Sequence, residues 1–124
     1  MYRLAITRDF IAQHYLVGGD WGRENEKHSH HYRAEIVIEG HELDRHGYLI
    51  DIVDLEKAVA EVIETARDRV LNDLAPFAGL NPSLEHFCRI FSEMLSELVR
   101  LPGKTLTVKL WENDRDWAAY KACL

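Results

Sequence analysis

The sequence predicts an α+β fold in which two helices cover one face of an antiparallel sheet. Polar and apolar residues alternate in two stretches near the start of the chain and in two near its end, as is typical of half-buried strands. Between them lie two stretches whose apolar residues recur every three or four positions, as is typical of amphipathic helices. The expected order of elements is therefore β-β-α-α-β-β.

The composition indicates one soluble domain spanning residues 1–124, because 47% of the residues are hydrophobic and 29% are charged. The net charge of −6 repels phosphate backbones and disfavours a nucleic-acid partner. Two cysteines cannot build a disulfide framework, and Arg3, Arg8 and Asp9 lie within the first ten positions, where a secretory signal is apolar. No apolar run approaches the ~18 residues of a membrane span. We therefore expect a cytoplasmic protein without a membrane partner.

The first predicted strand covers about residues 1–15, and the second begins around residue 28. The apolar residues of both strands fall on even-numbered positions, which favours an antiparallel pair if the chain folds back between them. Residues 16–27 contain three glycines and a run of charged residues, so they are expected to form a long loop, and such loops are often functional. The residues of the apolar parity are Tyr2, Leu4, Ile6, Phe10, Ala12 and His14 in the first strand and Tyr32, Ala34, Ile36 and Ile38 in the second.

The first helix is predicted from about Asp54, a suitable N-cap, to Leu74. The second is predicted to begin at Asn81-Pro82 and to end before Leu101, with Cys88 in its apolar stripe. Alternation over residues 105–110 and 118–124 predicts the last two strands, joined by a polar turn.

Three histidines fall in a pattern with chemical meaning. His28 and His30 lie two residues apart on one strand and therefore project to the same side, while His14 ends the matching parity of the first strand. Three neutral imidazoles with a fourth position open form the ligand set of a catalytic zinc site. A His-x-His pair alone is more typical of coincidence or of a solvent-facing strand, and the matching parity of His14 strengthens the case for metal. We expect His31, His41 and His46 at the surface, whereas the direction of His86 stays open.

Several motifs resemble those of the 6-pyruvoyl-tetrahydropterin synthase and 6-carboxy-tetrahydropterin synthase family. The resemblance covers nearly the whole chain, and its motifs come in the expected order of elements. They are FIAQH at 10–14, HSHHY at 28–32, GYLID at 47–51, LND at 71–73, NPSLE at 81–85 and VKLWE at 108–112.

The resemblance implies the tunnelling fold, or T-fold, in which subunits join their sheets into a barrel. It further implies a homohexamer built as a dimer of trimers, with active sites between subunits. Pairing between subunits would satisfy the open edges of a small sheet. The implied substrate is 7,8-dihydroneopterin triphosphate or a close dihydropterin. Zinc would hold the substrate's side-chain hydroxyls while a base moves protons at the side-chain carbons.

Two glutamates gain roles from this resemblance. Glu112 extends the apolar parity of the third strand, where a carboxylate needs a partner, and the resemblance implies a proton relay. The alternative is that Glu112 has already left the strand for solvent. Glu85 lies in the first turn of a helix, where any acidic residue is favourable. The resemblance instead implies that Glu85 anchors the pterin ring through two parallel hydrogen bonds.

The sequence departs from the family pattern at the proton-handling positions. The usual cysteine, four residues before the His-x-His pair, is Glu24, and the loop contains no thiol. Some members of this wider family carry glutamate in place of the cysteine. For them the resemblance implies a retro-aldol cleavage of the substrate's side chain that leaves 6-hydroxymethyl-dihydropterin. Glu26 is the neighbouring candidate base if the loop register shifts, and a solvated charged loop is the alternative for both. The usual Asp-His pair is replaced by Arg67 and Asp68.

These observations favour a zinc-dependent lyase acting on a dihydropterin side chain, with His14, His28 and His30 as ligands, Glu24 as base, Glu112 as relay and Glu85 as anchor. The reaction could be the synthase elimination, the carboxy-pterin variant that feeds deazapurine (queuosine) synthesis, or the hydroxymethyl branch that feeds folate. The alternative is a non-catalytic zinc- and pterin-binding paralogue that has lost the base. Arg23, Lys27 and Arg67 could meet a triphosphate or simply be exposed.

Overall fold

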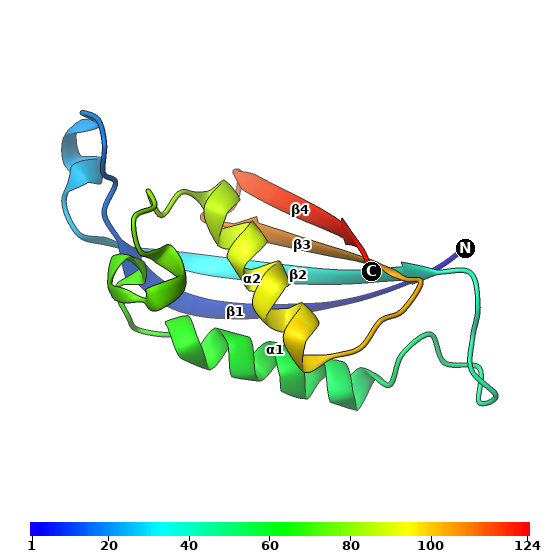
Figure 1. Cartoon of the computed structure of the whole chain (residues 1–124). Helices are drawn as coiled ribbons and strands as arrows, with labels where there is room; N and C mark the ends of the chain where they lie inside the picture. Colours follow the sequence, from blue (N-terminus) through cyan, green and yellow to red (C-terminus); the bar gives the residue numbers. More distant parts are fainter.

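The structure is a computed structural model that describes all of residues 1–124. Four strands form one antiparallel sheet in the order β1-β2-β3-β4, and two helices between β2 and β3 cover one face of it (Figure 1). This confirms the predicted order of elements. The bounds are β1 Tyr2–His14, β2 His28–Gly40, α1 Ile52–Ala66, α2 Leu84–Leu98, β3 Thr105–Trp111 and β4 Trp117–Cys123.

The pairing of β1 with β2 determines where the site forms. The register runs without interruption from Tyr2 opposite Gly40 to His14 opposite His28. Because no bulge interrupts it, every even-numbered residue of both strands keeps the same face. That face carries the buried core beneath the helices, a cluster of 25 buried hydrophobic residues. At the loop end of the hairpin the same face carries histidines instead of aliphatic side chains.

The first helix differs from the prediction at both ends. Its N-cap is Asp51, whose side chain accepts a hydrogen bond from the Val53 N–H, so the helix begins before Asp54. It ends at Ala66 because Asp68 adopts a left-handed φ of 57° and donates its N–H to the carbonyl of Ile11. The chain thereby leaves the helix to pair with the edge of β1.

The expected extension of this helix to Leu74 is wrong because the segment after Ala66 folds as short 3-10 turns, η2 Leu71–Asp73 and η3 Ala75–Phe77. Leu74, where the predicted helix ended, still packs against the core from these turns, and Leu71 and Phe77 are buried in it. The second helix begins at Leu84, after the N-cap Ser83, rather than at Asn81-Pro82. Cys88 is buried in its apolar stripe, as predicted.

Residues 15–27 connect β1 to β2 and contain one 3-10 turn, η1, over Gly22–Asn25. The loop projects beyond the sheet at the end that the histidines occupy (Figure 1). No helix is both long and apolar enough to cross a bilayer.

Candidate functional site

The imidazoles of His14, His28 and His30 meet at the loop end of the β1–β2 hairpin. Their ring centroids are separated by 4.5 Å, 4.9 Å and 4.8 Å. His14 is the last residue of β1 and is buried, while His28 and His30 open β2 and are partly buried. The structure thus brings together the three side chains singled out by strand parity.

Backbone carbonyls fix the tautomers of two of these rings. The Nδ1 of His14 lies 2.9 Å from the carbonyl oxygen of Pro82, and the Nδ1 of His28 lies 2.7 Å from that of Glu26. Because a carbonyl only accepts, each Nδ1 carries the proton and donates it. Each neutral ring therefore directs an unprotonated Nε2 into the cluster, which is the arrangement that orients metal-ligating histidines.

The nitrogens that point into the cluster lack ordinary partners. The Nε2 of His14 is buried without any hydrogen bond. The Nε2 of His28 lies 3.1 Å from that of His30 and 2.9 Å from a carboxylate oxygen of Glu24. Acceptors facing one another at these distances repel unless a proton or a cation lies between them. One ligating atom from each of these four residues lies within 4.8 Å of all the others, a set that could hold a metal ion.

The electrostatics favour neutral imidazoles. Burial lowers the pKa of His14, and the neighbouring His28 and His30 lower it further, against a hydrogen bond to Pro82 that raises it. Burial likewise lowers the pKa of His30. Neutral imidazole is the form that binds a metal, and three such rings suit zinc or another borderline-soft ion.

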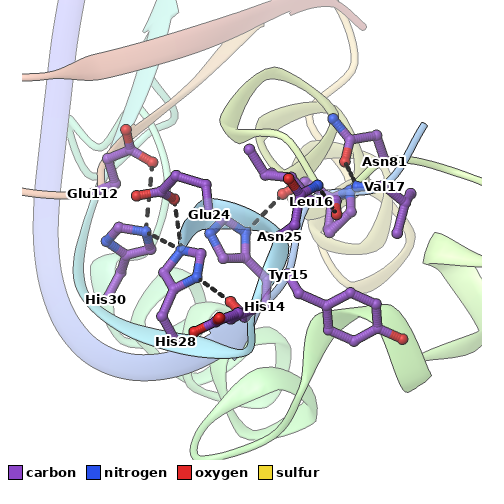
Figure 2. A network of polar contacts seen from close by, with 12 residues as sticks. His14, Tyr15, Leu16, Val17, Glu24, Asn25, His28, His30, Asn81 and Glu112 are labelled. Atoms are coloured by element: carbon purple, nitrogen blue, oxygen red, sulfur yellow. Dashed lines mark hydrogen bonds and ion pairs between the residues drawn. The ribbon is translucent and has the colours of Figure 1, made fainter. Parts of the chain in front are cut away.

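Glu24 reaches the cluster from the loop, within η1. Its carboxylate points at His28 (Figure 2), and its side chain is 53% exposed. Glu26, the neighbouring alternative, contributes its backbone carbonyl to His28, and its carboxylate is not part of the four-residue set. The register of the loop therefore favours Glu24 as the carboxylate of the site.

Glu112 stands one residue beyond β3 and turns toward the cluster rather than toward solvent. Its Oε2 lies 4.0 Å from the Nε2 of His30 (Figure 2), and its side chain is 29% exposed. Burial raises the pKa of this carboxyl, and the charge of Glu24 raises it further, whereas His14 lowers it. A raised pKa makes the protonated form of this carboxyl easier to reach, as a proton relay requires.

A cavity of about 450 Å³ opens beside the cluster and is walled by the loop, the start of α2 and the β3–β4 turn. Glu85, in the first turn of α2, lies on its wall, where the helix N-terminus favours a carboxylate. Asp116, Trp21 and Trp117 also line the cavity, although no motif in the sequence points to them. The long loop and the polar turn were the available signals for these residues.

Other residues considered from the sequence lie outside the cluster. His31 projects from the opposite parity of β2 and is exposed. His86 bonds through Nδ1 to the carbonyl of Asn81 and caps its own turn. The exposed Arg67 pairs with Glu64. Asp68, the other replacement for the Asp-His pair, lies against the edge of β1.

The fold and the cluster together define a T-fold protein with three histidines, at the end of its first hairpin, that could hold a metal ion. Solved structures share the fold: 6-pyruvoyl tetrahydropterin synthase from Caenorhabditis elegans superposes with a TM-score of 0.86 at 21% identity, covering 98% of this chain and 95% of that one. A variant of the Plasmodium vivax synthase, in which a glutamate described as its catalytic residue is replaced by alanine, has a TM-score of 0.80 at 15% identity and covers 99% and 98%.

Sequence comparison places the chain within a family. Residues 3–123 match the 6-pyruvoyl tetrahydropterin synthase family, and the chain belongs to it. It is also 31% identical over 114 residues to the dihydroneopterin monophosphate aldolase of Pyrococcus furiosus, with 90% of each chain covered.

Proposed function

We propose that this protein is a zinc-dependent lyase that cleaves the side chain of a dihydroneopterin-type substrate by a retro-aldol reaction. The observation that carries the proposal is the carboxylate of Glu24, 2.9 Å from His28 at the position where the family resemblance implies a thiol. The similarity to a dihydroneopterin monophosphate aldolase supports the same reaction. A glutamate is also named as catalytic in the Plasmodium vivax synthase, which supports a carboxylate as the base.

The residues present fit a zinc ion. His14, His28 and His30 would hold it, because two of them direct unprotonated Nε2 atoms inward and the Nε2 of His14 is a buried atom without a partner. Bound zinc would polarise the side-chain hydroxyls of the substrate and make them more acidic. No cysteine can substitute for Glu24, since burial raises the pKa of Cys88 to about 11 and Cys123 lies at the end of β4.

The proposed reaction divides proton transfer between two carboxylates. Glu24 accepts the proton of the hydroxyl on the second side-chain carbon, which becomes an aldehyde as its bond to the first carbon breaks. The electron pair of that bond moves to the first carbon, where conjugation with the ring C=N group stabilises it. Glu112 relays a proton back to this carbon. The products are 6-hydroxymethyl-dihydropterin and glycolaldehyde, or its phosphate ester.

Glu85 would select the pterin ring. Its carboxylate lines the cavity about the cluster and can accept two parallel hydrogen bonds from the ring amino group and the adjacent N–H. Anchoring at one end leaves the substrate side chain to reach toward the histidines. Glu85 would therefore govern substrate affinity more than the rate of bond cleavage.

We also propose the homohexamer, a dimer of trimers, as the assembly. β1 and β4 are the two edges of the sheet, and each leaves backbone groups free to pair with another subunit. The mass of the native assembly by light scattering tests this, and a monomer would contradict it.

A non-catalytic zinc- and pterin-binding paralogue is the second candidate. It is favoured by Arg67 and Asp68, which replace the family's Asp-His pair and lie outside the cluster. The two candidates predict different results when the zinc-loaded protein is incubated with dihydroneopterin and its phosphate esters.

Mass spectrometry of the products distinguishes the lyase from the non-catalytic paralogue. We expect 6-hydroxymethyl-dihydropterin from the wild-type protein and none above background from Glu24→Ala. A 6-pyruvoyl or 6-carboxy product would assign another reaction of the family. Tight pterin binding without turnover would favour the paralogue, and undiminished product from Glu24→Ala would remove Glu24 as the base.

A further inference from the structure

The loop that carries Glu24 requires something to hold it. Gly18 and Gly22 adopt left-handed φ values of 88° and 64°, and a side chain at either position would meet no atom within 4 Å. Residues 17–24 are all exposed, so the hydrophobic core does not hold this part of the loop. The carboxylate of Glu24 nevertheless lies within hydrogen-bond distance of His28.

The carboxamide of Asn25 spans the loop and bonds to three of its backbone groups. Its Nδ2 donates to the carbonyls of Leu16 and Gly19, both at 3.0 Å, and its Oδ1 accepts the N–H of Trp21 at 2.7 Å. The Leu16 N–H in turn donates to the carbonyl of Glu24 at 2.8 Å. These bonds join the first half of the loop to the second half at Glu24 and at Asn25.

Two further asparagines hold the start of the loop, the part to which Asn25 bonds. Asn72 accepts from the N–H of Tyr15 and donates to its carbonyl, at 3.0 Å and 2.9 Å. Asn81 accepts the N–H of Val17 at 2.8 Å (Figure 2). These residues belong to segments packed on the body of the protein, so Asn25 connects the exposed half of the loop to a half that is held in place.

We propose that Asn25 is a positioning residue that determines where the carboxylate of Glu24 lies relative to the histidines. This inference rests on the proposed function of Glu24 as the base. Asn25 does not line the cavity, so it acts through the backbone of its neighbour rather than on the substrate. A displacement of about 1 Å in a catalytic group can lower a rate by about 100-fold.

The test compares Asn25→Ala with Asp44→Ala, a control that removes a similar turn-capping side chain from a remote loop. We expect Asn25→Ala to lower kcat by about 10- to 100-fold with KM and zinc content little changed. In a Glu24→Gln background the same change should cost nothing further, because the base is already absent. The control should retain wild-type kcat.

A second measurement does not depend on activity. Arg23 and Lys27 are exposed trypsin sites within the loop, so loss of the carboxamide should speed cleavage at both by about tenfold or more while the melting temperature stays within a few degrees. An unchanged cleavage rate and an unchanged kcat in Asn25→Ala would overturn the inference. An equal loss of kcat in the Glu24→Gln background would also overturn it. A wild-type protein without turnover would overturn the proposed function as well, whereas an active wild type with an insensitive Asn25→Ala would overturn only the role of Asn25.

Discussion

The Oε2 of Glu24 lies 2.9 Å from the Nε2 of His28, the nitrogen that also faces His30 at 3.1 Å. The carboxylate therefore lies among the groups that could hold a metal ion, together with the three histidines. Four protein ligands would close a tetrahedral zinc site, whereas three leave a vertex for substrate. Because Glu24 is on an exposed loop and the histidines are on strands, Glu24 would be the group that leaves the ion and then acts as the proposed base.

Replacing Glu24 by glutamine should abolish most of the activity and keep the metal. The amide preserves the size of the side chain but cannot accept a proton, so we expect kcat to fall by about 100- to 10,000-fold. Zinc content, measured by elemental analysis, should stay stoichiometric because the three histidines remain. Glu26→Gln is the matched control, since its carboxylate is not in the cluster. Loss of activity in both variants would point to the charge of the loop rather than to one base.

Removing one imidazole should cost both zinc and stability. In His28→Ala the remaining ligands cannot retain the ion, whereas His31→Ala changes an exposed ring of the opposite parity. A ligand at a thousandfold excess over its Kd stabilises a protein by about 4 kcal/mol. We therefore expect zinc to raise the Tm of the wild type and of His31→Ala by about 10 °C or more, and that of His28→Ala hardly at all. A wild-type protein that gains no stability from zinc would contradict the metal site.

The histidine cluster could be predicted because it depends on local geometry. The period-two pattern of a strand and an unbroken register place His14, His28 and His30 on one face whatever the rest of the fold does. Asp51 and Ser83, in contrast, cap the helices a few positions from where the apolar spacing suggested. Helix ends depend on which polar group reaches the first free N–H groups, and several nearby residues could do so.

The position of Glu24 could not be predicted from periodicity. It depends on left-handed glycines and on side-chain to backbone bonds made by Asn25, none of which has a repeating signature. The end of α1 depends likewise on a tertiary interaction, the pairing of Asp68 with Ile11 at the edge of β1. The resemblance to a family pointed to Glu24 as a candidate base. The structure shows which loop contacts place its carboxylate next to His28.

Glu85→Gln should weaken substrate binding rather than slow the reaction. The amide offers one acceptor and one donor in place of two acceptors, so one of two bonds to the pterin ring becomes repulsive. We expect KM to rise by about 10- to 100-fold with kcat within about threefold. Glu93→Gln is the control on the same helix, because Glu93 pairs with Arg89 away from the cavity. A fall in kcat alone would assign Glu85 to chemistry.

The two cysteines should differ in reactivity with pH. Cys88 is buried and donates to the carbonyl of Ala118, and burial raises its pKa to about 11, while Cys123 is exposed. Alkylation by iodoacetamide requires the thiolate. At pH 9 we therefore expect one equivalent of label, located on Cys123 by peptide mapping, and a second only after denaturation. Rapid labelling of Cys88 in the native protein would contradict the packing of α2 on β4.

The phosphate content of the substrate should affect turnover through charge. Glu24, Glu85, Glu112 and Asp116 line the cavity, and no lysine or arginine does, so each added phosphate is repelled within the protomer. The exposed Arg23 and Lys27 lie outside this lining. We therefore expect kcat/KM to decrease from dihydroneopterin or its monophosphate to the triphosphate. Because salt screens charge over about 8–10 Å, raising the ionic strength should narrow this difference. A triphosphate preferred at low salt would mean that a neighbouring subunit supplies cations to the cavity, and charge-reversing Arg23 and Lys27 would then test whether these residues are their source.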